Sequence, residues 1–354
     1  MGLAAGGERS PPCQPRGTPK TVSGLRGQPR SCPRRVFTEH NDQVGRRRGL
    51  LTTRACRWAL DQLAGEHASV LGLARQLGVA WKTVWGTLKP ILAARAADES
   101  RFAGVTTLGV DEHVWHHVST RHRGPKELTG MVDLTRDKDG HVQARLLDLV
   151  AGRSGTVYKT WLDARGDTFK KRVQVATLDP FHGYKNAIDD KLADATAVLD
   201  AFHVVALAGH ALDEVRRRIQ QETLGHRGRA GDPLYGIRNL LRCGSERLTP
   251  KQWFRLLAAV DADERHEPVW VAWQCAQQVR DVYHEPDPAK GRALAEQIVA
   301  SFPSCPISEV ARLARLGRTL KQWKYAFLAY FDTGRASNGG SEAIKCRRRH
   351  LMAY

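Results

Sequence analysis

Hydrophobic positions change from a helical to a strand-like spacing near residue 101, and this change predicts two kinds of structure. Before it, apolar residues fall three or four positions apart in the stretch "ASVLGLARQLGVAWKTVWGTLKPIL". Gly78 divides that stretch into two apolar faces, which are Val70, Leu73, Ala74 and Leu77, and then Val79, Val84, Trp85 and Leu88. A helical period interrupted by a glycine predicts two helices joined by a short turn.

Beyond residue 101, short β-branched segments alternate with turn-rich pieces. The segments "VTTLGVDEHVWHHVS", "ELTGMVDLT" and "VQARLLDLV" predict three strands joined by hairpins, the second with Asp139 and Gly140 in its turn. Helical spacing in "SGTVYKTWLDARGD" and "GYKNAIDDKLAD" then alternates with the strand patterns of "RVQVATLD" and "TAVLDAFHVV", the last running into a helix. The predicted order βββαβαβα is that of an α/β, ribonuclease H-like core.

The balance of charge bears on what the two N-terminal helices bind. The 354 residues hold 55 Lys and Arg against 37 Asp and Glu, a formal net charge of +18, which is typical of a protein that binds nucleic acid. The helix pair then predicts a helix-turn-helix, with Trp81, Lys82 and Thr83 near the start of the helix that enters a DNA major groove. A basic run before the helices is expected to add DNA contacts: Arg46, Arg47 and Arg48. An ordinary helical hairpin has the same pattern, and that interpretation stays open.

Two further features bear on the compartment. The seven cysteines are scattered and form no C-x-x-C pair, which fits a reducing cytoplasm. No apolar run approaches the roughly 18 residues of a membrane helix, and the N-terminus lacks the apolar core of a signal peptide. We therefore expect a soluble cytoplasmic protein, associated with the nucleoid through its DNA partner, and no membrane partner.

Three acidic residues are candidates for a metal centre. Asp111 falls on the first predicted strand and Asp179 ends the fourth, and these strands carry metal-binding acids in a ribonuclease H-like fold. Phosphodiester cleavage can use two Mg²⁺ ions about 4 Å apart, and such hard cations prefer carboxylate oxygens. The third candidate is Glu342 in "SNGGSEAIK", where the turn Asn338-Gly339-Gly340 precedes a helix expected to start at Ser341.

Each acid also has a purely structural interpretation, and these stay open. Asp179, before a proline, is in a position to cap the following helix. Asp111 is compatible with a turn at a strand end, and Glu342 with an ordinary first-turn glutamate favoured by the helix dipole. Asp200 and His203 in "LDAFHVV" form a second pair, either an accessory group that positions the metal site or DNA, or a structural hydrogen-bonded pair.

Five segments together resemble one known family. They are "LGVDEH", "TLDPFHGYKNAI", "VLDAFHVV", "RTLKQWKYAFLAYFDTG" and "SNGGSEAIK", and they closely resemble the DDE transposases of the ISL3 insertion-sequence family, over roughly Ser31 to Lys345. The resemblance implies that Asp111, Asp179 and Glu342 are a catalytic triad that holds two Mg²⁺ ions, with Mn²⁺ as a substitute. It also implies that water cleaves at the element's ends and that the freed 3′-hydroxyl attacks target DNA. The implied partners are double-stranded DNA, as terminal inverted repeats and as target, and a second copy in a homodimer.

The two ends depart from the family's pattern. The family's zinc-binding segment has two cysteine pairs, whereas "SCPRRVFTEH" keeps only Cys32, and Cys13 lies in unrelated sequence. One or two thiolates cannot form a closed four-ligand site, so we expect no zinc. Twelve residues follow Glu342, where the family continues in a longer helical tail. An inactive, truncated transposase that only binds DNA therefore stays open beside the active enzyme, as does a nuclease without strand transfer.

The patterns and the resemblance together predict five regions. A flexible basic arm, the remnant of the zinc segment, is expected at 1–40 and a helix-turn-helix domain at 45–100. The ribonuclease H-like core is expected at 101–210, an α-helical insertion at 211–330, and the end of the core with the third acidic residue at 331–354. The gap of 163 residues between Asp179 and Glu342 is too long for a bare core, which is why an insertion is expected.

Overall fold

The computed structural model describes most of the chain as two compact units. The described residues are 41, 43–46, 49–66, 68–114, 126–304, 311–341 and 343–344. One unit comprises residues 1–100 and 347–354, and the other comprises residues 101–346. The predicted basic arm at 1–40, with Cys13 and Cys32, lies outside the described residues.

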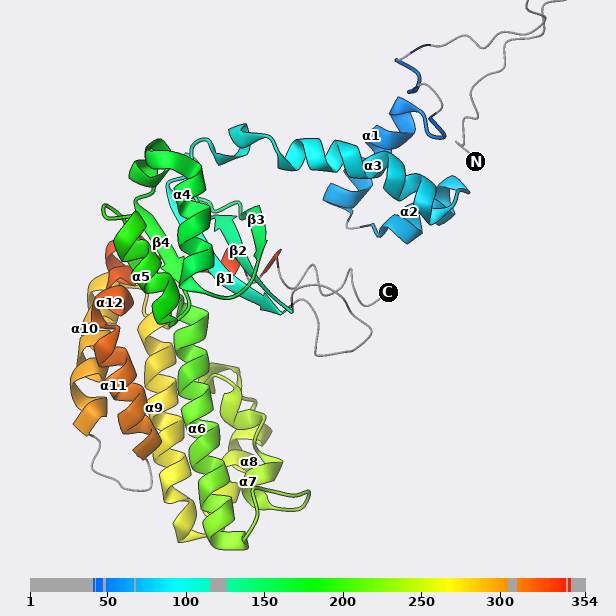
Figure 1. Cartoon of the computed structure of the whole chain (residues 1–354). Helices are drawn as coiled ribbons and strands as arrows, with labels where there is room; N and C mark the ends of the chain where they lie inside the picture. The colour runs from blue at the N-terminus through cyan, green and yellow to red at the C-terminus, as the bar shows by residue number, and fades with distance from the viewer. Residues whose placement is uncertain are drawn as a thin grey trace, which may run out of the picture. The chain divides into compact units, whose positions relative to one another are not determined.

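The described part of the first unit is built from three helices (Figure 1): α1 (Thr53–Gly65), α2 (Val70–Leu77) and α3 (Trp81–Ala96). The Ser69 hydroxyl caps α2 by accepting a hydrogen bond from the Gly72 amide at 3.0 Å. Gly78 ends α2 with a φ of 64°, a left-handed conformation that glycine adopts without strain. The predicted helices on either side of Gly78 are therefore present, and their apolar faces form a small core with α1: Ala59, Leu60, Leu73, Leu77, Val84 and Leu88.

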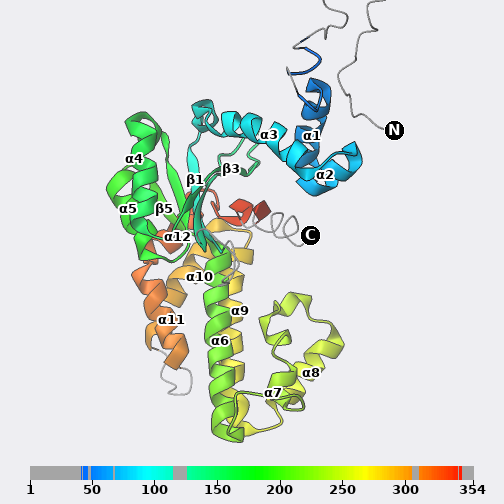
Figure 2. The same cartoon turned by 45° about the vertical axis from the view of Figure 1, so that its right-hand side comes forward.

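The second unit contains a mixed five-stranded sheet (Figures 1 and 2). Its strands are β1 (Thr107–Val114), β2 (Glu127–Asp133), β3 (Arg145–Ala151), β4 (Val175–Leu178) and β5 (Thr196–Leu199). The spatial order is β3-β2-β1-β4-β5, antiparallel from β3 to β1 and parallel from β1 to β5. Helices α4 (Gly155–Arg172), α5 (His182–Lys191) and α6 (Ala201–Leu224) follow β3, β4 and β5. This element order matches the one predicted from the sequence and is consistent with a ribonuclease H-like core.

The two faces of the sheet have different surroundings. Side chains alternate along a strand, so Glu112 of β1 shares a face with its register partner Thr129 of β2. The Thr129 hydroxyl lies 3.2 Å from the Tyr184 hydroxyl of α5, which places α5 on that face. Gly109 and Asp111 point to the opposite face. Asp111, the first candidate acid, therefore lies on the face of the sheet opposite α5.

Helices make up most of the chain after β5. They are α6, α7 (Pro233–Gly236), α8 (Pro250–Val260), α9 (Glu267–His284), α10 (Pro288–Ser301), α11 (Ala311–Gln322) and α12 (Lys324–Asp332). Figures 1 and 2 show α6 and α9 side by side, and α12 packs beside β5. The buried residues of these helices and of the sheet form one continuous core. Among the helices described, none combines the length and the apolar character that crossing a membrane requires.

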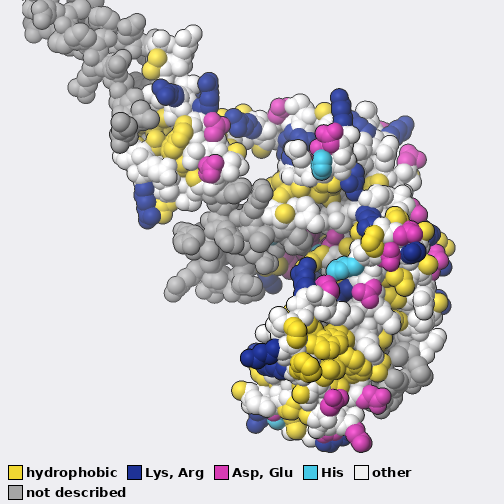
Figure 3. Space-filling model, turned by 180° about the vertical axis from the view of Figure 1, so that it is seen from behind, with side chains coloured by type: hydrophobic (Ala, Val, Ile, Leu, Met, Phe, Trp, Pro, Cys, Tyr) yellow, Lys and Arg dark blue, Asp and Glu magenta, His cyan; other side chains and the backbone are white. Residues whose placement is uncertain are grey.

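Hydrophobic side chains also reach the surface of this helical part. Figure 3 shows them gathered on one face. On α8 and α9 the indole rings of Trp253, Trp270 and Trp273 pack against one another, with the closest centroids 5.0 Å apart. Phe254, next to them in sequence, is exposed.

Candidate active site

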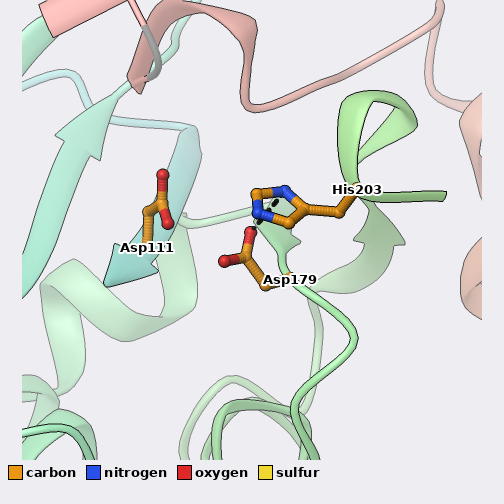
Figure 4. A group of neighbouring side chains, drawn as sticks. All are labelled: Asp111, Asp179 and His203. Atoms are coloured by element: carbon orange, nitrogen blue, oxygen red, sulfur yellow. Dashed lines mark ion pairs between the residues drawn. The ribbon is translucent and has the colours of Figure 1, made fainter. Parts of the chain in front are cut away.

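The sheet brings Asp111 and Asp179 together. Asp111 lies inside β1, opposite Gly130 of β2, and Asp179 directly follows β4, the parallel neighbour of β1. The two residues are 2% and 8% exposed. One carboxylate oxygen from each acid and one ring nitrogen of His203 all lie within 4.8 Å of one another (Figure 4). Two residues that are 68 positions apart in the sequence therefore share one buried site.

Two of the structural interpretations left open for these acids do not hold. The N-cap residue of α5 is Phe181, and no side chain caps that helix, so the capping interpretation of Asp179 is wrong. The Asp179 side chain instead contacts His203. The strand-end interpretation of Asp111 is also wrong, because β1 continues to Val114.

His203 connects Asp179 to Asp200. Its Nδ1 lies 3.0 Å from Asp179 Oδ1 and 2.9 Å from Asp200 Oδ2. Asp200 is fully buried and is the N-cap of α6, where its Oδ2 also accepts the His203 backbone N–H at 3.3 Å. Burial lowers the pKa of His203, but the hydrogen bonds to Asp179 and Asp200 and their negative charges outweigh it and raise the pKa to about 10. Asp200 and His203 are therefore a hydrogen-bonded pair, and His203 also contacts Asp179.

The donor atoms at this site fit a hard divalent cation. Mg²⁺ is usually held by one or two carboxylates, with the rest of its octahedral shell filled by water and substrate phosphate oxygens. Asp111 and Asp179 supply two carboxylates in a buried position, where uncompensated negative charge is costly. A bound cation would offset that charge, as the imidazolium of His203 does in part.

A second acidic group has a simpler explanation. Asp137, Asp139 and His141 also lie close together, and all three are exposed. Asp137 Oδ1 accepts the backbone N–H groups of Asp139 and His141 at 3.0 and 2.9 Å, so the group is a turn held by its own hydrogen bonds.

The third candidate acid, Glu342, lies outside the described residues. Helical conformation in the segment before it begins at Gly339, two residues earlier than the predicted start at Ser341. Asn338, considered from the sequence only as a turn residue, is fully buried and hydrogen-bonded to β1, which contains Asp111, and to β4, which Asp179 follows. This contact was not predicted from the sequence. A glycine inside a strand, Gly109, was the available sign that another segment approaches the backbone closely.

The candidate DNA-binding residues lie in the first unit. Trp81 and Lys82 are exposed at the start of α3, and Thr83 is half-buried. The Trp81 ring stacks on that of Trp85, with their centroids 5.9 Å apart. Arg46 is exposed. Arg47 and Arg48 lie outside the described residues.

Comparison with known proteins gives the family of this chain. The family model DDE_Tnp_ISL3, described as transposase, matches residues 108–352. The match covers more than half of the chain and spans both acids of the site. The chain therefore belongs to the ISL3 family of DDE transposases.

Individual relatives are more distant. The chain is similar to the transposase for insertion sequence element IS1557 from two strains of Mycobacterium tuberculosis, at 25% identity over 293 residues. That alignment takes in 77% of this chain and 61% of the relatives, so the chain spans less than two thirds of their length. Among solved structures it is similar to the Drosophila P element transposase strand transfer complex, with 11% identity and a TM-score of 0.42. That match covers 82% of this chain and 84% of the other.

Proposed function

We propose that this chain is a metal-dependent DNA transposase that acts at the ends of an insertion sequence. The observation that carries the proposal is the pair of buried carboxylates of Asp111, in β1, and Asp179, directly after the neighbouring parallel strand β4. Membership of a DDE transposase family supports the reaction class. The proposed reaction is hydrolysis of a phosphodiester at the element's end, followed by attack of the freed 3′-hydroxyl on a target-DNA phosphate, which releases a 3′-hydroxyl of the target.

Asp111 and Asp179 would hold Mg²⁺, or Mn²⁺ in its place, with Glu342 as the proposed third ligand. When bound, such ions activate the attacking oxygen and stabilise the leaving oxygen. β1 contains Asp111, and the end of the parallel strand β4 places Asp179 beside it. His203 orients the Asp179 carboxylate through its Nδ1, and Asp200 holds that ring through the second contact of the same nitrogen. In this proposal Asp200 and His203 are accessory residues.

The first unit is the proposed DNA-recognition domain. Helices α2 and α3 with the turn at Gly78 would form the helix-turn-helix, and the exposed Trp81 and Lys82 would face the major groove. A net charge of +18 supports a DNA partner. Two ends must be joined in one reaction, so we propose a homodimer.

The second unit would be the catalytic domain, with a helical insertion. We propose that the core at 101–210 is completed by the chain from residue 331 onward, after an insertion at 211–330. The hydrogen bonds of Asn338 to β1 and β4 support this division, because the chain packs against the sheet again at this residue, after the helices.

The test is strand cleavage by the full chain on duplex DNA that carries the sequences flanking its own gene. We expect nicks at the element's ends with Mg²⁺ and none with chelator. Specific binding without cleavage in Mg²⁺ or Mn²⁺ would instead identify a DNA-binding protein without catalytic activity. Cleavage without joining of a pre-cut end to target DNA would identify a nuclease that lacks strand transfer.

A further inference from the structure

Asn338 is a buried asparagine that joins separate parts of the second unit. Its side-chain Nδ2 donates to the Val110 carbonyl of β1 at 3.0 Å, and its Oδ1 accepts from the Thr177 hydroxyl of β4 at 2.9 Å. Its backbone N–H donates to Asp200 Oδ1 at 2.8 Å. Asn338, Thr177 and Asp200 are all fully buried. One residue thus contacts β1, β4 and the N-cap of α6.

Gly109 and Gly340 leave the space in which the segment that contains Asn338 packs against its neighbours. A Cβ atom on Gly109 would lie 2.4 Å from Asn338 Oδ1 and 2.7 Å from a methyl carbon of Leu134. A Cβ atom on Gly340 would lie 2.5 Å from the Cβ of Ala144. Side chains at either position would push the 338–341 segment away from the sheet.

The hydrogen bonds of Asn338 lead to both candidate acids. Val110 immediately precedes Asp111 in β1. Asp200, which accepts the Asn338 N–H with one oxygen, contacts His203 with the other, and His203 contacts Asp179. Asn338 therefore contacts the residue next to Asp111 in β1, and it reaches Asp179 through the two side chains of Asp200 and His203.

The chemistry of the position selects an amide. The Val110 carbonyl requires a donor, whereas Oδ1 accepts from two hydroxyls, those of Thr177 and Ser341, the latter at 2.9 Å. An amide has both functions in one planar group, and a carboxylate has only acceptors. A buried polar group that lacks a hydrogen bond lowers the stability of the fold. The group opposite the Val110 carbonyl must therefore be a hydrogen-bond donor.

We propose that Asn338 is a positioning residue that fixes β1, β4 and the Asp200–His203 pair relative to one another, so that Asp111 and Asp179 are preorganised for a divalent cation. This role rests on the proposed function, because it assumes that the two aspartates bind metal. Asn338 does not touch the cation itself. It acts on Asp111 through the backbone of Val110 and on Asp179 through Asp200 and His203.

The test is Mn²⁺ binding to the full chain without DNA, followed by electron paramagnetic resonance of the free ion. Asn338→Asp keeps the side-chain size but sets an oxygen against the Val110 carbonyl and adds a charge near Asp200. We expect Mn²⁺ affinity to fall about tenfold or more, the usual effect of changing a group behind a metal ligand. Asn239→Asp makes the same change at an exposed position and should leave affinity unchanged. Asp111→Asn is the reference for loss of the site.

A second, milder variant covers the case in which Asn338→Asp does not fold. Thr177→Val keeps the shape of the side chain and removes a single hydrogen bond to Asn338, so we expect a loss in Mn²⁺ affinity of about twofold to fivefold. Wild-type affinity in Thr177→Val and in any folded Asn338→Asp would overturn the positioning role while leaving the metal site intact. Absence of Mn²⁺ binding in the wild type, or equal binding in Asp111→Asn, would overturn the proposed function and this inference with it.

Discussion

Asp179 and His203 are held 3.0 Å apart, from Oδ1 to Nδ1, and the same imidazole nitrogen lies 2.9 Å from Asp200. The ring therefore sits between two carboxylates that are each nearly or fully buried. A cationic imidazole offsets negative charge that burial would otherwise penalise. Figure 4 shows the Asp179 carboxylate beside the His203 ring, with both groups extending toward Asp111.

Removing this ring should destabilise the metal-free protein. His203→Ala leaves two buried carboxylates without their shared partner, so we expect the free energy of unfolding to fall by about 1–3 kcal/mol. Saturating Mg²⁺ should then raise the melting temperature of the variant more than that of the wild type, because the ion supplies the missing positive charge. Thermal unfolding with and without Mg²⁺ measures both effects. His210→Ala, at an exposed position on the same helix, is the control, and an equal loss in both variants would contradict the role of His203.

Substitution of Asp111 or Asp179 should reduce DNA cleavage without changing DNA affinity. Asp111→Asn and Asp179→Asn remove a metal-binding charge with little change in volume, so we expect cleavage at the element's ends to fall by about 100-fold or more. Affinity for the same DNA should stay within about twofold, because the proposed recognition helix lies in the other unit. A cleavage assay and a binding titration on one set of DNA ends check both statements. Cleavage at the wild-type rate in either variant would refute the assignment.

The parts of the site that depend on local structure were predictable from the sequence, and the parts that depend on contacts between distant residues were not. The strands and helices of the sheet followed from local periodicity, and Asp111 and Asp179 fell at neighbouring strands once the element order was known. The role of Asn338 was not predictable in the same way, because its partners Asp200 and Thr177 lie 138 and 161 residues away in the sequence. The local sequence pattern does not indicate contacts between residues so far apart in the chain. The capping interpretation of Asp179 failed for the same reason, since the competing partner, His203, is brought in by the fold.

Lys82 should contribute to DNA binding through the phosphate backbone. If α3 is the recognition helix, Lys82→Gln should weaken binding at low salt and reduce the slope of log affinity against log salt by about 1. Lys290→Gln, exposed on α10 in the second unit, is the matched control. Fluorescence anisotropy across a salt series gives both slopes. Identical slopes for Lys82→Gln and the wild type would favour an ordinary helical hairpin.

The turn between α2 and α3 should depend on glycine at position 78. Gly78 has a φ of 64°, and a Cβ atom there would meet nothing within 4 Å, so the cost of a side chain is the backbone conformation alone. We expect Gly78→Ala to destabilise the first unit by about 1 kcal/mol, and Gly78→Asn by less, because asparagine tolerates the left-handed region better.

A second glycine in the same unit provides the control for position 78. Gly86 lies inside α3 with equal space around it and without a positive φ, so Gly86→Ala should stabilise the helix by about 0.5–1 kcal/mol. Hydrogen exchange of peptides from α2 and α3, followed in the full chain by mass spectrometry, reports on this unit separately from the rest. Opposite signs for the two substitutions are expected; protection unchanged by Gly78→Ala would mean that the α2–α3 turn does not require the left-handed conformation.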